Sequence, residues 1–266
     1  NHFQLYTNHF ITGFFLYFIW FLIALNIPAN SLNSYYDRKA DAKNPRKMKS
    51  WMIANDSDKW PVFIGVMFAV IFFIIINLAF SNFKITFLVA SGYLGAFLYS
   101  HYATRVKNIL LFDTLVGAVA YVVPLLSGYV FITNNWPSFL MVIAAFLYFG
   151  ATELYAKIID IDSVKSSGEL SSARALGKQG SLVVCIAAII TAGFILALGA
   201  KLIYGLVVIA PLSVFIFSLF IKNHDFFMRF YLKTTIIYGL WGFIATSYFV
   251  IPIVNKILNH FFILSD

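Results

Sequence analysis

The apolar segments of this sequence limit the folds that are open to it. Eight runs have about the length that an α-helix needs to cross the hydrocarbon core of a bilayer. They cover residues 9–31, 60–80, 85–101, 114–132, 137–158, 181–200, 202–221 and 234–254. With 61% hydrophobic and only 11% charged residues, the composition is that of a membrane protein. We therefore predict an all-α transmembrane bundle of eight spans, forming a single membrane domain over residues 1–266.

The connections between these segments alternate between long and short. The long ones follow the first, third, fifth and seventh segments and contain 15 of the 19 basic residues. Because cytoplasmic loops are enriched in lysine and arginine, these four connections are predicted to face the cytoplasm. The net charge of +8 then reflects orientation in the membrane, and no nucleic-acid partner is expected. The same rule places Asn1 outside, so we expect one further span upstream of it.

The acidic residues follow the same distribution, with 10 of the 11 on or near the predicted cytoplasmic side. Acids contribute little to orientation, so their clustering needs another reason. Asn33, Asp37 and Asp41 are spaced four residues apart, which puts them on one face of a helix. Two carboxylates at this spacing repel each other unless a positive charge lies between them. This pattern predicts a cation site on the cytoplasmic face.

The chemistry of that first acidic motif favours Mg²⁺, which commonly takes one or two carboxylates and fills its other positions with water and substrate phosphate oxygens. Basic residues follow the motif, among them Lys43 and Arg46, and these suit a diphosphate. The alternative is a solvated charged loop after a membrane helix.

A second acidic stretch follows the fifth segment. Glu153, Lys157 and Asp160 share a helix face, and Asp162 lies just beyond them. Glu153 and Lys157 by themselves favour an ordinary ion pair at a helix end. Together with the first motif, Asp160 and Asp162 become candidate ligands for a second cation or for the far side of a shared one.

A third candidate region follows the third segment. Arg105 can form a bidentate contact with phosphate oxygens, and Lys107 can act as a point charge. The alternative is plain positive flanking of a span. Asp113 begins the next span, where it can equally serve as a cap or as a partner of the helix dipole.

The motifs together resemble those of the UbiA-type intramembrane prenyltransferase superfamily. Asn33-x-x-x-Asp37-x-x-x-Asp41 resembles its first signature, and Tyr99-Ser100…Arg105-Val-Lys107…Asp113 resembles its middle one. Within the superfamily the chain looks most like the lycopene elongase, or carotenoid-prenylating, branch. That likeness rests on three stretches: Pro28-Ala-Asn30…Asn33…Asp37…Asp41…Asn44-Pro45-Arg46-Lys47, Tyr121-Val-Val-Pro124…Gly128-Tyr129, and Asp160-Ile-Asp162.

The resemblance implies nine helices around a central cavity that opens to the cytoplasmic side, and a faint repeat suggests two four-helix units, about residues 9–132 and 137–254. It implies catalytic roles for Asp37, Asp41, Asp160 and Tyr99. By the same likeness Mg²⁺ would be held by Asn33, Asp37, Asp41 and Asp160. The substrate would contact Asn30, Asn33, Lys43, Arg46, Ser100, Arg105, Lys107 and Asp162.

The second aspartate motif departs from the family pattern, because Val164 stands where the family usually has aspartate, and valine cannot bind a cation.

The leading interpretation is an Mg²⁺-dependent enzyme in the membrane, with its active site facing the cytoplasm. It would transfer an isoprenyl group from an allylic diphosphate to a lipophilic acceptor from the lipid, such as lycopene, and release diphosphate. Two alternatives stay open: a UbiA-type terpene cyclase acting on one prenyl diphosphate, and a non-catalytic partner subunit or transporter.

Overall fold

The structure, a computed structural model, is all-helical where it describes the chain. It describes residues 26–41, 60–80, 82–101, 106, 109–161, 171–199, 205, 208–209, 211–223, 226–227, 229–231 and 233–234, and no strand occurs among them. The helices are α2 (Asn26–Asp41), α3 (Trp60–Phe80), α4 (Phe83–Ser100), α5 (Phe112–Thr133), α6 (Phe139–Ile158), α8 (Ser172–Gly199) and α10 (Leu212–Phe220).

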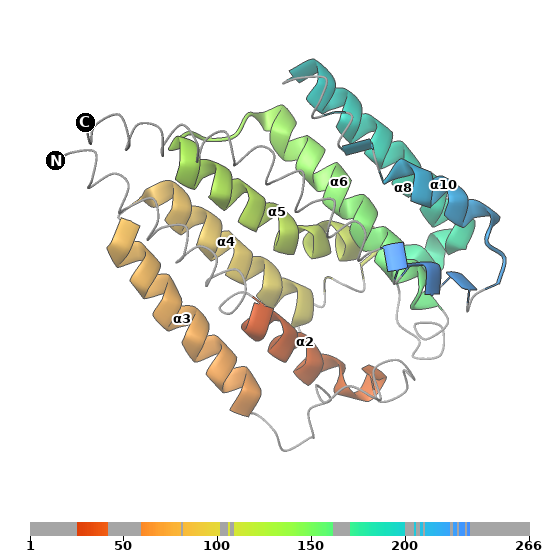
Figure 1. The fold of residues 1–266 in the computed structure, drawn as a ribbon. Coiled ribbons are helices and arrows are strands. Elements are labelled where there is room, and N and C mark those ends of the chain that lie inside the picture. Colours follow the sequence, from red (N-terminus) through yellow and green to blue (C-terminus); the bar gives the residue numbers. More distant parts are fainter. Residues whose placement is uncertain are drawn as a thin grey trace, which may run out of the picture.

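Figure 1 shows α3, α4, α5, α6 and α8 lying side by side in chain order, with α2 packed against α3 and α4, and α10 against α8. Within the described residues, five helices, α3, α4, α5, α6 and α8, are long and apolar enough to cross a membrane. This confirms an all-helical membrane protein, and α3 has the predicted bounds. The segments predicted at 9–31, 202–221 and 234–254 lie largely outside the described residues, so the total of eight spans stays a prediction.

One predicted boundary is wrong. The sixth span was expected to begin at residue 181, but α8 begins at Ser172. The helix bends at Gly177, whose φ of 67° and ψ of 173° are accessible to glycine and strained for other residues. Hydropathy finds only the apolar part beyond the bend, because the short first arm carries polar residues. That arm brings Ser172 to the polar end of the bundle.

Two short turns meet at the opposite end of the helices. The Asn82 side chain accepts a hydrogen bond from the Lys84 backbone N–H at 2.9 Å and so caps α4. Its amide donates to Asn134 Oδ1 at 3.1 Å, and Lys84 Nζ donates to the Asn134 carbonyl at 2.6 Å. Asn134 ends α5 in the left-handed conformation. The turns before α4 and after α5 therefore lie together, as the predicted alternation of connections requires.

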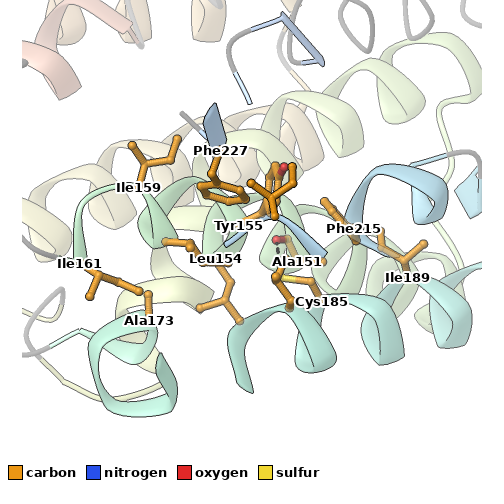
Figure 2. Packing of buried hydrophobic residues seen from close by; sticks show 13 residues of the cluster. Ala151, Leu154, Tyr155, Ile159, Ile161, Ala173, Cys185, Ile189, Phe215 and Phe227 are labelled. Atoms are coloured by element: carbon orange, nitrogen blue, oxygen red, sulfur yellow. Dashed lines mark hydrogen bonds between the residues drawn. The ribbon is translucent and has the colours of Figure 1, made fainter. Parts of the chain in front are cut away.

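The larger of two buried apolar clusters lies between α6, α8 and α10 (Figure 2). Tyr155 is 5% exposed, and its ring packs against Phe215 and Phe227, with ring centroids 4.8 Å and 5.7 Å away. Cys185 is fully buried and donates a hydrogen bond to the Ala151 carbonyl at 3.2 Å. A second cluster joins α3, α4 and α5 and includes Ala145 of α6. The surrounding lipid is as apolar as these side chains, so the hydrophobic effect does not drive the helices together. Close van der Waals packing between them does so instead.

Small residues let α8 approach the segment that follows it, and this gives a testable prediction. A methyl group on Gly205 would lie 2.6 Å from the Gly193 carbonyl oxygen and 2.8 Å from Ala197 Cβ. Because one of these atoms is backbone, the helices must separate to admit the methyl group. We expect Gly205→Ala to lower the free energy of unfolding by about 1–3 kcal/mol, measured by thermal or denaturant unfolding in detergent.

The matched control for this prediction is Gly199→Ala. A methyl group there would lie 3.7 Å from Leu140 Cδ1, which is an ordinary van der Waals distance. We expect this variant to unfold at the wild-type midpoint. Equal midpoints for Gly205→Ala and the wild type would show that this close helix contact does not contribute to stability.

Candidate functional site

The first acidic motif lies on helix α2. Pro28 lies near the N-terminal end of the described part of α2. It packs tightly against α3, because a methyl group on Gly65 would come within 3.0 Å of Pro28 Cα. Leu32 is also buried. Asp37 lies nine residues beyond Pro28 and therefore on the opposite face of α2, which also points inward there because Asp37 is buried.

Asn33 and Asp37 place two oxygen donors one helical turn apart on this inward face. Asp37 is only 6% exposed. Asn33 Oδ1 is buried and makes no hydrogen bond to any described residue. A buried oxygen left in this state costs about 1–3 kcal/mol, which a cation or a hydrogen-bond donor on a ligand would offset. An amide oxygen beside a carboxylate is a donor set that suits Mg²⁺, so the residues present fit that ion.

The full predicted metal set is not seen together. Within the described part of the chain, no three side chains of His, Cys, Asp or Glu form a group able to hold a metal ion. Asp41 ends α2, but its side chain lies outside the described residues, as does that of Asn30. Lys43, Arg46, Arg105, Lys107 and Asp162 also lie outside them, so their predicted roles stay predictions.

Aromatic contacts join α2 to the end of α4. The Tyr36 ring meets His101 edge-on, with centroids 5.4 Å apart, and His101 stacks on Phe97 at 4.5 Å. This places the first motif beside Tyr99 and Ser100, the last two residues of α4. Ser100 is buried, 1% exposed. The first motif and the start of the middle motif therefore lie close together.

Tyr99 lies between the first motif and a polar cluster on α6. Lys157 Nζ sits over its ring, 5.5 Å from the centroid, in cation–π geometry. Asp37, Glu153 and Asp113 are all close enough for their charges to act on the Tyr99 hydroxyl. Helices α2, α4, α5 and α6 thus contribute to one polar region at the same end of the bundle.

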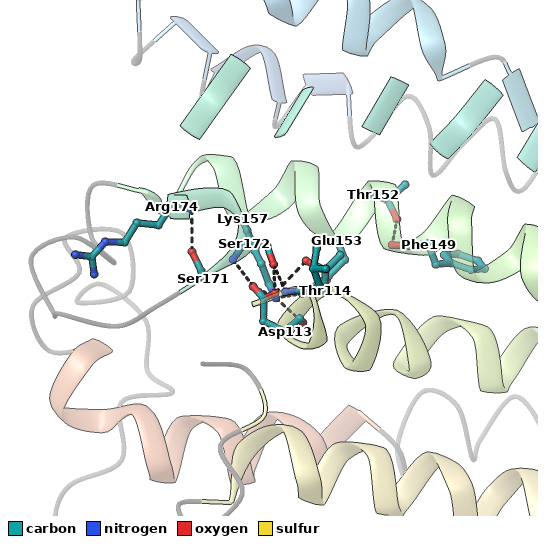
Figure 3. A network of polar contacts seen from close by, with 10 residues as sticks. Asp113, Thr114, Phe149, Thr152, Glu153, Lys157, Ser171, Ser172 and Arg174 are labelled. Atoms are coloured by element: carbon teal, nitrogen blue, oxygen red, sulfur yellow. Dashed lines mark hydrogen bonds and ion pairs between the residues drawn. The ribbon is translucent and has the colours of Figure 1, made fainter. Parts of the chain in front are cut away.

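Asp113 is the centre of that polar region (Figure 3). It is fully buried in the first turn of α5. Lys157 Nζ donates to its carbonyl oxygen at 2.6 Å and to its Oδ2 at 3.2 Å. The Ser172 backbone N–H donates to Oδ2 at 3.0 Å, and the Ser172 hydroxyl donates to Oδ1. The sequence left a cap or a dipole partner as the roles of Asp113. The structure shows a buried link between α5, α6 and α8.

Asp160 follows the C-terminal end of α6. Its backbone N–H donates to the Lys157 carbonyl at 3.2 Å, and the residue is half-buried. Through this backbone contact with Lys157 it adjoins the same polar region. Asp160 therefore lies at the end of the bundle where the sequence placed it, beyond the helix that carries Lys157.

A cavity of about 340 Å³ adjoins this polar region on its apolar side. Its walls come from α5, α6, α10 and the residues after α10. Most of the lining is aromatic, including Tyr121, Phe149, Tyr155, Phe215 and Tyr231. Tyr121 and Phe149 stack with centroids 5.6 Å apart and planes 13° apart. Such a volume is typical of small-molecule sites.

Glu153 connects the polar region with the cavity. Its carboxylate is 3.5 Å from Lys157 Nζ, and the residue also lines the cavity. The sequence correctly gave the pairing with Lys157 but interpreted it as an ordinary helix-end contact. An ionisable residue inside a membrane-spanning helix is itself a signal of function, and that signal was available from residues 139–158.

Comparison with known proteins identifies the family. The model of the UbiA prenyltransferase family matches residues 4–252. This chain belongs to the UbiA prenyltransferase family. The match covers nearly the whole sequence and confirms the resemblance that the motifs indicated. UbiA-family proteins are integral membrane prenyltransferases, which agrees with the five described helices that are long and apolar enough to cross a membrane.

Two relatives of this UbiA-family chain carry the same name. The lycopene elongase/hydratase of Corynebacterium glutamicum is 25% identical over 174 residues, which cover 64% of this chain and 60% of the relative. A protein of the same name from Halobacterium salinarum is 25% identical over 199 residues, covering 74% and 70%. The chain thus spans 60% of the length of the Corynebacterium relative. No solved structure matches the chain at a significant level.

Proposed function

We propose that this protein is an Mg²⁺-dependent prenyltransferase that moves an isoprenyl group from an allylic diphosphate to a lipophilic acceptor in the membrane. The observation that carries the proposal is the buried pair on α2: Asn33 Oδ1, without a hydrogen-bond partner among the described residues, lies one turn from the carboxylate of Asp37. This pair sits beside Tyr99, at the polar end of a UbiA-family bundle.

The polar end would hold the diphosphate. Asn33, Asp37, Asp41 and Asp160 are the residues that would hold Mg²⁺, which when bound neutralises negative charge on the leaving diphosphate. Arg105 and Lys107, with Lys43 and Arg46, would grip phosphate oxygens. Asn30, Ser100 and Asp162 would complete the contacts to the substrate.

The aromatic cavity would hold the reacting carbons. Breaking the C–O bond leaves an allylic cation, which aromatic faces stabilise by cation–π contact. Tyr99 borders the polar end, and Tyr121 and Tyr155 line the cavity beyond it. An apolar cavity also keeps water from hydrolysing the cation. The bond then forms with an electron-rich carbon of the acceptor.

We further propose a carotenoid such as lycopene as the acceptor, because two relatives are named lycopene elongase/hydratase. The membrane supplies such an acceptor directly. Two further proposals follow from the distribution of charge: the active site faces the cytoplasm, and the chain is one membrane domain built from two four-helix units.

The test of this function is turnover by the purified protein in nanodiscs. Allylic diphosphates of increasing chain length are supplied with Mg²⁺, with and without lycopene, and products are identified by mass spectrometry. A prenylated adduct that requires the acceptor supports transfer. A cyclised product formed without acceptor would instead show a terpene cyclase. Absence of any product and of diphosphate release would contradict the proposal and leave a role as a non-catalytic partner subunit.

Removal of divalent cations gives a separate prediction. After dialysis against a chelator, we expect diphosphate release to fall to background, because the leaving group loses its charge neutralisation. Adding Mg²⁺ back should restore release, whereas added Na⁺ at equal ionic strength should not. Full release in the chelated protein would show that Asn33 and Asp37 do not act through a metal ion.

A further inference from the structure

We infer that Glu153 is the proton acceptor that ends the prenyl-transfer reaction, an inference that rests on the proposed function. Glu153 is on α6, within a helix that crosses the membrane. A carboxylate at such a depth is costly and is usually kept for a role in function. Here it faces the aromatic cavity, where the carbon chemistry would take place.

Among the described residues that line the cavity, Glu153 is the only one with a carboxylate. Three other polar side chains of the lining already make hydrogen bonds within the protein. The Thr152 hydroxyl donates to the Phe149 carbonyl at 2.9 Å, and the Thr234 hydroxyl donates to the Phe230 carbonyl at 2.8 Å. The Tyr155 hydroxyl pairs with Ser218 Oγ at 2.8 Å. Of the groups in this lining, the Glu153 carboxylate is the one suited to receive a proton.

The position of Glu153 is set from two sides. A methyl group on Gly117 would lie 2.7 Å from Glu153 Oε1 and 2.8 Å from its Cδ, so the absence of a side chain at Gly117 makes room for the carboxylate. Lys157 Nζ lies 3.5 Å away on the other side. The side chain is thus held between α5 and its own helix.

The ion pair with Lys157 is not by itself a sufficient reason for a carboxylate at position 153. Lys157 already donates to the Asp113 carbonyl oxygen at 2.6 Å and to Asp113 Oδ2 at 3.2 Å. The lysine therefore has a buried counter-charge on α5 without Glu153. A second carboxylate beside it adds a base at the cavity wall, with Lys157 as a nearby positive charge.

The chemistry needs such a base. The C–O bond of the allylic diphosphate breaks, and both of its electrons leave with the diphosphate. Two π electrons of the acceptor then form the new C–C bond, which leaves a carbocation on the adduct. Loss of a proton from the adjacent carbon restores a double bond, and Glu153 would take that proton. The carboxylic acid that results returns its proton to water before the next turnover. No oxidant or reductant is required.

The test is Glu153→Gln, which keeps the shape of the side chain and removes the base. In nanodiscs, with allylic diphosphate, Mg²⁺ and lycopene, diphosphate release and product composition are measured together. We expect the deprotonated adduct formed per diphosphate released to fall about a hundredfold, with the cation captured by water as an alcohol instead. Diphosphate release itself should stay within about threefold of wild type, because ionisation does not use this proton transfer.

Two further variants separate catalysis from structure. Glu153→Asp retains a carboxylate and should restore part of the deprotonated adduct. Gly117→Ala leaves Glu153 in the chain but displaces its carboxylate, and should shift the products in the same direction as Glu153→Gln. If Glu153→Gln does not fold, Gly117→Ala carries the test. Thr191→Val, a polar-to-apolar change on the exposed face of α8, controls for polar loss within a span.

An unchanged ratio of deprotonated adduct to diphosphate in Glu153→Gln and Gly117→Ala would overturn the inference. A purely structural role would lower diphosphate release and thermal stability together while leaving that ratio as in the wild type, and this result would also overturn it. Failure of the proposed function has a different signature, because wild-type protein would then form no adduct that requires the acceptor. The two ideas can therefore fail separately.

Discussion

Replacing Asp37 with asparagine is expected to reduce diphosphate release at least about a hundredfold, the usual cost of removing one group that stabilises charge in a transition state. Asp37 is buried on α2, within electrostatic range of Tyr99, and lies one turn from the buried oxygen of Asn33. Asparagine keeps the shape of the side chain and removes the charge that would hold the cation. Release is measured by a coupled phosphate assay in nanodiscs.

The control for this variant is Asp266→Asn, the same substitution in the last residue of the chain, which we expect on the other side of the membrane. It should turn over at the wild-type rate. Gel filtration and thermal unfolding show whether each variant is folded. A folded Asp37→Asn protein with wild-type release would exclude α2 from the active site and, with it, the proposed function.

Asp113→Ala is expected to lower the free energy of unfolding by about 3–5 kcal/mol. Asp113 is fully buried and accepts hydrogen bonds from Lys157 and Ser172. Alanine removes the fully buried carboxylate from Lys157, which keeps only Glu153 at 3.5 Å, and removes the acceptor of two donors on Ser172. Unfolding is followed by circular dichroism in detergent, as a loss of helix with increasing temperature or denaturant.

Asp113→Asn serves as the graded comparison. Its amide oxygen can still accept from Ser172, but it carries no charge for Lys157, so we expect a loss smaller than that of alanine. If both variants unfold at the wild-type midpoint, the polar contacts around Asp113 do not support the fold. Because Lys157 also lies over the Tyr99 ring, activity should fall together with stability in Asp113→Ala.

The sequence predicted the helices well because their signal is local. A long apolar run identifies a span without any knowledge of its neighbours, and α3 agrees with its prediction at both ends. The start of α8 was missed because the arm before Gly177 is polar and gives no hydropathy signal. Its helix depends on contacts to Asp113 that are distant in the chain.

For the candidate site too, the sequence predicted the local features and missed the contacts between distant segments. The spacing of Asn33 and Asp37 predicted one helix face, and the structure places them there. The link between Asp113 and Ser172 spans 59 residues, and the contact between Gly117 and Glu153 joins two helices. No periodicity within one segment can show such contacts. Glu153 was therefore recognised as a partner of Lys157 and not as part of a cavity wall.

The attachment of Lys157 and Ser172 to the same residue, Asp113, has a consequence for the connection between α6 and α8. The chain leaves α6 and returns to α8 at one anchored point, so the ends of this connection are fixed by the helices and not by its own sequence. The entropy of bringing such ends together grows only slowly with length. The connection, which carries Asp162, can thus be lengthened, shortened or exchanged between relatives while the bundle beneath it stays unchanged.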